Sequence, residues 1–297
     1  MSASRVVISG ASGLIGGALT QSLRADGIRV VHLVRRPPRG ADEIEWLTGE
    51  PLDPEVLAGA TAVVNLNGAS IGRLPWGQQY QQTLLRSRIE PTAVLADALI
   101  ALGSSAPALL SASAVGYYGD RPGESLDESS SPGRTFLAEV CVRWEAEARR
   151  AADTTRVVLL RTAPLLHPDA VLKPMIALTR LGLGGPLGSG KQVWPWISLD
   201  DEVRAIRHLI DSDIAGPVNL AGPARATANE IGRTLAGRLH RPYLLPAPAW
   251  ALRLVLGRAA ADSLLLADAD VTPRMLTGSG FTFAQPTAEA AIADAVG

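Results

Sequence analysis

The sequence predicts an α/β fold in which a doubly wound parallel sheet is joined by a smaller, mostly helical C-terminal lobe. In the first half of the chain, short β-branched runs alternate with longer segments of helical periodicity, which is the pattern of βαβ units around a parallel sheet. Beyond Arg161, proline and glycine interrupt that alternation, most densely in GLGGPLGSG at residues 182–190. The chain is therefore expected to leave the sheet there.

The expected strands recur at the spacing that intervening helices require. They are Arg5–Ser9, Arg29–Val34, Ile44–Leu47, Ala62–Leu66, Ala108–Ala112 and Arg156–Arg161, with a return strand at Pro217–Leu220. Gly27 and Gly103 stand where the first helix and a long helix from about Gly77 to Leu102 should end. Another helix is expected to start near Asp200. The run SLDESSSPG, residues 125–133, is expected to be an exposed loop.

Composition excludes several classes of protein. With 47% hydrophobic and 19% charged residues among 297, the chain is not a disordered one, and a formal net charge of -1 suggests neither nucleic acid nor an anionic membrane as a partner. No leader and no apolar span are recognisable, so the expected location is cytoplasmic. The single cysteine, Cys141, allows no internal disulfide, and the four histidines show no metal-ligand spacing.

The segment after the first strand reads Gly10-Ala-Ser-Gly13-Leu-Ile-Gly16 and leads into a helical pattern. Gly10 permits a tight turn, Gly13 lets the backbone approach a pyrophosphate, and Gly16 lets helix and strand pack closely. The helix N-terminus then offers free N–H groups to phosphates. A tight turn that binds nothing is the alternative, but strand, loop and helix in this order favour a dinucleotide-binding Rossmann domain.

Arg35 and Arg36 follow the second strand, where a domain that prefers NAD usually carries an acidic residue for the ribose 2′-hydroxyl. Two guanidinium groups instead suit the 2′-phosphate of NADP(H), because each offers a planar, permanently charged fork to an oxyanion. A solvated basic turn is the alternative. The expected cofactor is therefore NADP(H).

Beside the glycine loop, the chain carries the motifs NLNGAS, SASAVGYYG, LRT, WISLDD, RLPW, SRIEPT, WEAEA, GLGGPLGSGKQ and PAPAWALRLVLG. Together they resemble an atypical extended short-chain dehydrogenase/reductase of the nucleoside-diphosphate-sugar epimerase family, with a C-terminal domain of uncharacterised function. The resemblance covers essentially the whole chain. It implies an NADP-binding Rossmann domain at residues 1–165, completed by about 198–232. Residues 166–197 and 233–297 would form a small lobe on the substrate side.

The resemblance also implies roles for individual residues. Ser12, Leu14 and Ile15 would line the diphosphate together with the loop glycines, and Asn67, Gly68 and Ala69 would pass beside the adenosine ribose. Arg88, at a position where the superfamily commonly has asparagine, would reach the cofactor or active-site water, unless it is a surface arginine. Lys191, Trp194 and Trp196 would help to form the substrate pocket, although the tryptophans could equally pack between the lobes.

The usual catalytic pair of this superfamily, a tyrosine and a lysine four residues later, is missing. A nearby cation makes the phenolate of such a tyrosine accessible, because its pKa is otherwise near 10. The corresponding helix carries either Phe136 and Val140 or Leu137 and Cys141, depending on whether Trp144 or Glu145 is aligned. Glu139, Arg143 and Glu145 could supply a charge or form a solvated face.

Ser113, Tyr117 and Tyr118 remain as candidate catalytic residues, the serine to orient a substrate and a tyrosine as a substitute acid. Their alternatives are a strand-end serine bonded to its own backbone and tyrosines packed on the cofactor. Asp200 and Asp201 are expected to cap a helix. The sequence therefore predicts an NADP(H)-binding oxidoreductase or epimerase-like protein with an unknown small-molecule substrate, as a monomer or homodimer; the alternative is a catalytically silent NADP(H) sensor or scaffold.

Overall fold

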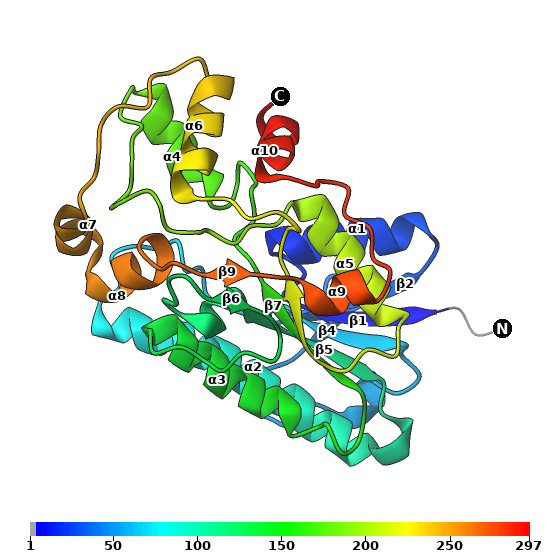
Figure 1. Ribbon diagram of the computed structural model, residues 1–297. Coiled ribbons are helices and arrows are strands. Elements are labelled where there is room, and N and C mark those ends of the chain that lie inside the picture. Colours follow the sequence, from blue (N-terminus) through cyan, green and yellow to red (C-terminus); the bar gives the residue numbers. More distant parts are fainter. Residues whose placement is uncertain (1–3) are drawn as a thin grey trace.

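A parallel sheet of seven strands forms the centre of the protein (Figure 1), which we describe from a computed structural model for residues 4–297. The strand order is β3-β2-β1-β4-β5-β7-β8. The strands are β1 (Arg5–Ser9), β2 (Arg29–Val34), β3 (Glu43–Glu45), β4 (Ala62–Asn65), β5 (Ala108–Ala114), β7 (Val157–Thr162) and β8 (Gly216–Leu220). The order reverses between β1 and β4, and in sheets of this kind ligands bind at such a point, outside the carboxyl ends of the strands.

Most strand bounds lie within two residues of those predicted. β3 is shorter than expected and ends at Glu45, because Leu47, with φ 58°, cannot continue an extended strand. β5 runs on to Ala114, since Ser113 and Ala114 pair with Arg161 and Thr162 of β7. Pairing with a neighbouring strand extends β5 beyond what its own sequence pattern shows.

Four helices cover the two faces of the sheet (Figure 1). Helices α1 (Leu14–Ala25) and α5 (Leu199–Ile210) pack against each other on one face, and α2 (Gln78–Leu102) and α3 (Phe136–Arg149) pack on the other. Each face has its own apolar core: Leu19 and Ile206 belong to the first, and Leu95 and Leu99 to the second. Strands buried on both sides read as nearly continuous apolar runs, which explains why they were recognisable from sequence.

The C-terminal region is largely helical, and most of it lies beyond the carboxyl ends of the strands, while residues 274–278 pack against β8 (Figure 1). Its helices are α4 (Leu172–Arg180), α6 (Ala228–Arg238), α7 (Ala249–Leu256), α8 (Arg258–Ala260), α9 (Arg274–Gly278) and α10 (Ala288–Val296). A separate apolar cluster, which includes Leu172, Ile231 and Ile292, holds α4, α6 and α10 together. The predicted fold class is therefore confirmed, while the residue bounds of the two domains stay a prediction.

A second, two-stranded parallel sheet joins β6 (Ser125–Leu126) to β9 (Asp270–Val271). The prediction of an exposed loop over residues 125–133 is wrong at its start, because the side chain of Leu126 is 1% exposed and belongs to the core. Two-residue strands have no periodicity, so the sequence does not reveal them.

The C-terminal segment is tied to α5 by one buried carboxylate. Asp201 accepts hydrogen bonds from the backbone N–H groups of Ala284 (2.7 Å) and Gln285 (3.0 Å). The predicted capping role needs correction, since Ser198 is the N-cap residue and its hydroxyl accepts from the N–H of Asp201. Asp200 is exposed in the first turn, where its charge favours the helix dipole.

Candidate functional site

The turn between β1 and α1 leaves no room for a side chain at Gly10 or Gly16. A Cβ atom on Gly10 would lie 2.6 Å from the carbonyl oxygen of Leu66, and one on Gly16 would lie 2.5 Å from the carbonyl oxygen of Gly10. Gly13 is the N-cap of α1, makes no side-chain cap, and has no acidic residue in the turn that follows. The first N–H groups of α1 are therefore available to an anion, as the diphosphate of a dinucleotide requires.

The other residues predicted at this loop lie in the same turn. Ser12 is exposed, and Leu14 and Ile15, half-buried, begin α1. Their backbone N–H groups lie at the N-terminal end of α1, next to Gly13. The structure thus brings the predicted diphosphate residues together in one cradle that fits the group.

A buried polar network holds the segment after β4 against this cradle. Asn65 is fully buried and accepts hydrogen bonds from the hydroxyl of Ser9 (3.0 Å) and the amide of Asn67 (2.8 Å). Its own amide donates to the hydroxyl of Thr92 on α2 (2.8 Å). The network fixes the backbone at Asn67 beside Gly10. Sequence reasoning missed Ser9 and Asn65, because a polar residue at a strand end is an ordinary feature.

The two arginines after β2 have different surroundings. Arg36 donates to both carboxylate oxygens of Glu43, at 2.6 and 2.8 Å, and this contact lowers the pKa of Glu43 to about 2. Arg35 is exposed, and within residues 4–297 its guanidinium has neither an ion pair nor a hydrogen bond. Arg36 is therefore occupied by a carboxylate, whereas the fork of Arg35 is free for a phosphate.

Arg88 is a largely buried cation and not a surface arginine. Its guanidinium donates to the carbonyl oxygens of Leu84 (2.9 Å) and Ala69 (3.2 Å) and lies 5.2 Å from the ring centroid of Trp144. Burial lowers the pKa of Arg88. A Cβ atom on Gly68 would lie 3.1 Å from the guanidinium carbon, so a larger residue there would push the cation aside by a few tenths of an ångström.

The helix positions considered for the missing catalytic pair have different surroundings in the structure. Leu137 contacts Gly116, whereas Phe136 turns away and packs on Trp76, with ring centroids 5.7 Å apart. Cys141 lies beside Ser113, so Leu137 and Cys141 are the residues that face the end of β5. Burial, with the charge of Glu145, raises the pKa of Cys141 to about 12, which leaves an inert thiol.

A buried ion pair lies beneath this edge of the sheet. Glu145 of α3 is 0% exposed and accepts from Arg161 of β7 at 2.8 and 3.0 Å, while Arg161 is 1% exposed. Glu145 also accepts from the hydroxyl of Ser113 (2.8 Å) and from Arg149 (2.9 Å). Burial opposes the charge of Arg161, but the carboxylate outweighs it and raises the pKa of the guanidinium. Glu145 is thus a core carboxylate, while Glu139 and Arg143 form the solvated face.

The two candidate tyrosines differ in access. Tyr118 is fully buried; its hydroxyl donates to Asn219 (2.7 Å) and accepts from Arg161 (3.0 Å), and burial raises the pKa of Tyr118 to about 12. This geometry does not support the predicted acid role for Tyr118. Tyr117 is half-buried, the guanidinium of Arg161 lies 3.5 Å from its ring centroid, and its hydroxyl has no partner within residues 4–297.

The predicted substrate residues do not converge. Trp194 and Trp196 are 8% and 2% exposed and belong to the apolar cluster of the C-terminal region, where their indole N–H groups donate to the carbonyl oxygens of Leu265 and Ala224. Lys191 points to solvent. The substrate role is therefore not supported for the tryptophans, since burial of their rings takes up the surface that a ligand would contact.

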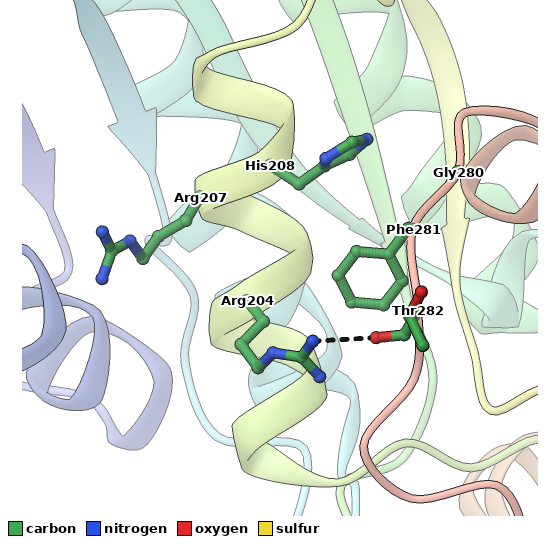
Figure 2. Close-up of a pocket in the computed structure, with 6 residues that line it drawn as sticks. All are labelled: Arg204, Arg207, His208, Gly280, Phe281 and Thr282. Atoms are coloured by element: carbon green, nitrogen blue, oxygen red, sulfur yellow. Dashed lines mark hydrogen bonds between the residues drawn. The ribbon is translucent and has the colours of Figure 1, made fainter.

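A hollow of about 400 Å³ between α5 and the C-terminal segment has its polar groups already paired (Figure 2). Arg204 donates to the carbonyl oxygen of Thr282 (2.9 Å), as the dashed line in Figure 2 shows. Arg207 bonds Ser22 and Asp26 on α1, and His208 contacts the hydroxyl of Ser279. These residues join elements of the fold and leave little for a ligand.

Residues 4–297 contain neither a cluster suited to a metal ion nor a helix suited to cross a membrane. Across these residues there is no group of three or more His, Cys, Asp or Glu side chains that could hold a metal ion. Over the same stretch, no helix combines the length and the apolar character needed to cross a bilayer.

Curated relatives align along nearly the entire chain. An epimerase family protein of Mycobacterium bovis is 43% identical over 94% of this chain and 93% of its own length. The human epimerase family protein SDR39U1 is 33% identical over 98% and 99%, respectively. These relatives and the chain therefore share one organisation from end to end.

Solved structures and family matches agree with the geometry. The crystal structure of human epimerase family protein SDR39U1 (isoform 2) with NADPH covers 98% of this chain and 99% of its own, with 32% identity and a TM-score of 0.89. A nucleoside-diphosphate sugar epimerase of Corynebacterium glutamicum matches with a TM-score of 0.80 and 30% identity, over 100% of this chain and 59% of its own. Residues 247–295 match a domain of unknown function, DUF1731, and residues 6–221 match the NAD dependent epimerase/dehydratase family. The resemblance predicted from the motifs is confirmed, and the chain belongs to that family.

Proposed function

We propose that this protein binds NADP(H) along the carboxyl edge of the sheet and acts as an oxidoreductase or epimerase-like enzyme with an altered proton donor. The observation that carries the proposal is the glycine cradle at the start of α1 together with the free guanidinium of Arg35. A solved relative with 32% identity was crystallised with NADPH, which supports the same cofactor here. When bound, NADPH would supply a hydride to the substrate.

In this proposal Arg35 holds the 2′-phosphate, and Arg36 has a different task. Its ion pair with Glu43 neutralises a carboxylate that would otherwise repel a phosphate nearby. Arg35 thus adds an attraction for the 2′-phosphate, and the ion pair of Arg36 with Glu43 removes a repulsion. Both effects favour NADP(H) over NAD(H).

Changing Arg35 to alanine should weaken NADPH binding by about 10- to 100-fold and leave NADH binding unchanged, because a charge-assisted hydrogen bond contributes about 1.5–3 kcal/mol. Fluorescence titration, read through energy transfer from tryptophan to nicotinamide, measures both affinities. Arg29→Ala is the matched control, since Arg29 begins β2 and therefore lies at the end of the strand that is far from Arg35. Equal losses for NADPH and NADH would remove Arg35 from the 2′-phosphate site.

Tyr117 is the proposed proton donor. It is the half-buried tyrosine of this edge, and Arg161 places a fixed positive charge against its ring. Such a charge stabilises the negative charge that a phenol acquires on giving up its proton. The buried pair of Arg161 and Glu145 keeps that charge in place, and Ser113, bonded to Glu145, positions the end of β5.

Tyr117→Phe should lower NADPH oxidation with a carbonyl substrate found by screening by about 10²- to 10⁴-fold, the usual contribution of a general acid. The affinity for NADPH should stay unchanged. Tyr118→Phe is the control from the same segment and should keep its turnover, because its hydroxyl is bonded inside the core. Full turnover in Tyr117→Phe together with loss in Tyr118→Phe would reverse the assignment.

The second candidate function is a catalytically silent NADP(H)-binding sensor or scaffold. Leu137 and Cys141 favour it, because neither side chain can relay a proton at the end of β5. The screen separates the two: NADPH that binds but is oxidised by no carbonyl compound would support the sensor.

A further inference from the structure

A second hollow, of about 580 Å³, lies between the sheet domain and the C-terminal region. Three segments far apart in sequence line it: the start of α2 with Trp76 before it, the start of α3, and the turns from Arg258 to Ser263. Figure 1 shows α8 close to the first turns of α2. An apolar cluster that includes Trp76, Leu84, Phe136 and Ala260 packs these three segments against one another.

The hollow carries a net positive charge. Arg134 and Arg258 line it, both are exposed, and within residues 4–297 neither makes an ion pair or a side-chain hydrogen bond. The acidic side chain in the lining, Asp262, is already paired with Arg253 at 2.7 Å. Two uncompensated guanidinium groups at one concave site favour a ligand with two negative charges.

Two aromatic side chains, Trp76 and Phe136, help to line the hollow. Phe136 is half-buried and packs on Trp76, whose indole N–H is committed to the carbonyl oxygen of Ile71 (3.0 Å). The ring of Phe136 therefore offers an apolar face and no polar partner. Aromatic rings prefer flat apolar groups stacked or set edge-on against them.

We propose that this hollow binds an organic phosphate, with the phosphate held by Arg134 and Arg258 and a flat ring against Phe136. A phosphate monoester carries close to two negative charges at neutral pH, which matches the two free guanidinium groups better than a carboxylate does. Leu137 joins the same apolar cluster and also contacts Gly116, so the hollow adjoins the segment that carries Tyr117. The site does not depend on the hydride chemistry proposed above.

Calorimetric titration with phenyl phosphate tests the site, with inorganic phosphate and phenol as partial probes at fixed ionic strength. Phenyl phosphate should bind at least tenfold more tightly than either partial probe. Arg134→Gln and Arg258→Gln should each weaken it about tenfold or more, and the double variant should abolish it. Arg86→Gln, an exposed arginine further along α2, should bind like the unchanged protein.

Three outcomes would overturn the proposal: no binding of phenyl phosphate, inorganic phosphate binding just as tightly, or affinity unaltered by both arginine variants. Because Arg134 and Arg258 are exposed, their variants should fold, and circular dichroism checks this. NADPH titration of the same variants should show unchanged affinity. If the unchanged protein binds phenyl phosphate but does not bind NADPH, the proposed function is wrong, whereas the phosphate site remains supported.

Discussion

Glu145→Ala is expected to lower the free energy of unfolding by about 3–5 kcal/mol, the cost of removing one partner from a buried ion pair. The carboxylate is fully buried and accepts from Arg161, Ser113 and Arg149. Without it, the guanidinium of Arg161 stays buried with no carboxylate partner and keeps the hydroxyl of Tyr118, a weak contact to a carbonyl oxygen and the ring of Tyr117. A buried cation without its carboxylate partner lowers the stability of the folded state strongly.

Urea denaturation at neutral pH measures the effect. Glu139→Ala on the same helix is the matched control, because Glu139 is exposed and its distance to Arg143 is 3.7 Å. Exposed pairs contribute about 0–1 kcal/mol, so this variant should remain close to the unchanged protein. Two variants of equal stability would show that water reaches Arg161 and that the pair is not buried in solution.

Glu202→Gln is expected to stabilise the protein at pH 8 by about 2–4 kcal/mol and to have little effect near pH 4.5. Burial raises the pKa of Glu202 from 4.5 to about 8, although a hydrogen bond from Thr162 opposes the rise. Between these two pH values the folded protein keeps a proton that the unfolded chain has lost. Stability therefore falls as pH rises through this window, and glutamine removes the titrating group while keeping the shape.

Thermal or urea unfolding from pH 4.5 to 8.5 should show a steeper decline for the unchanged protein than for Glu202→Gln. Asp200→Asn is the control on the same turn of α5; its side chain is exposed, and losing its charge at the helix N-terminus should cost about 0.3–1 kcal/mol. Parallel stability curves for the unchanged protein and Glu202→Gln would mean that Glu202 ionises in the folded state as easily as in the unfolded one.

The elements that sequence predicts best are those whose own residues decide their conformation. β1 and β2 have the predicted bounds because each is a short, largely apolar and β-branched run that ends at a turn. Gly27 follows α1 at φ 73°, and Gly103 caps α2 at φ 57°. Glycine adopts positive φ values without the steric clash that a Cβ atom would cause. The glycine loop between β1 and α1 is likewise an element whose own residues decide its conformation.

The features that sequence misses depend on partners distant along the chain. Glu145 reads as one more charge on an amphipathic helix until Arg161 of β7 is placed against it. Trp194 and Trp196 look like ligand-binding aromatics, but the packing of α6 and α10 around them is a tertiary effect. Arg134 and Arg258 line the same hollow only because the fold places residues 258–263 of the C-terminal region beside the starts of α2 and α3.

The ladder between β6 and β9 has a consequence for how the protein is made. The hydroxyl of Thr272, next to β9, bonds the carbonyl oxygen of Leu126 at a separation of 146 residues. Closing so long a loop costs entropy that only the finished contacts repay. During synthesis, Leu126 leaves the ribosome long before its partner strand exists. The two-stranded sheet of β6 and β9 is therefore assembled only once the chain has emerged at least as far as Val271.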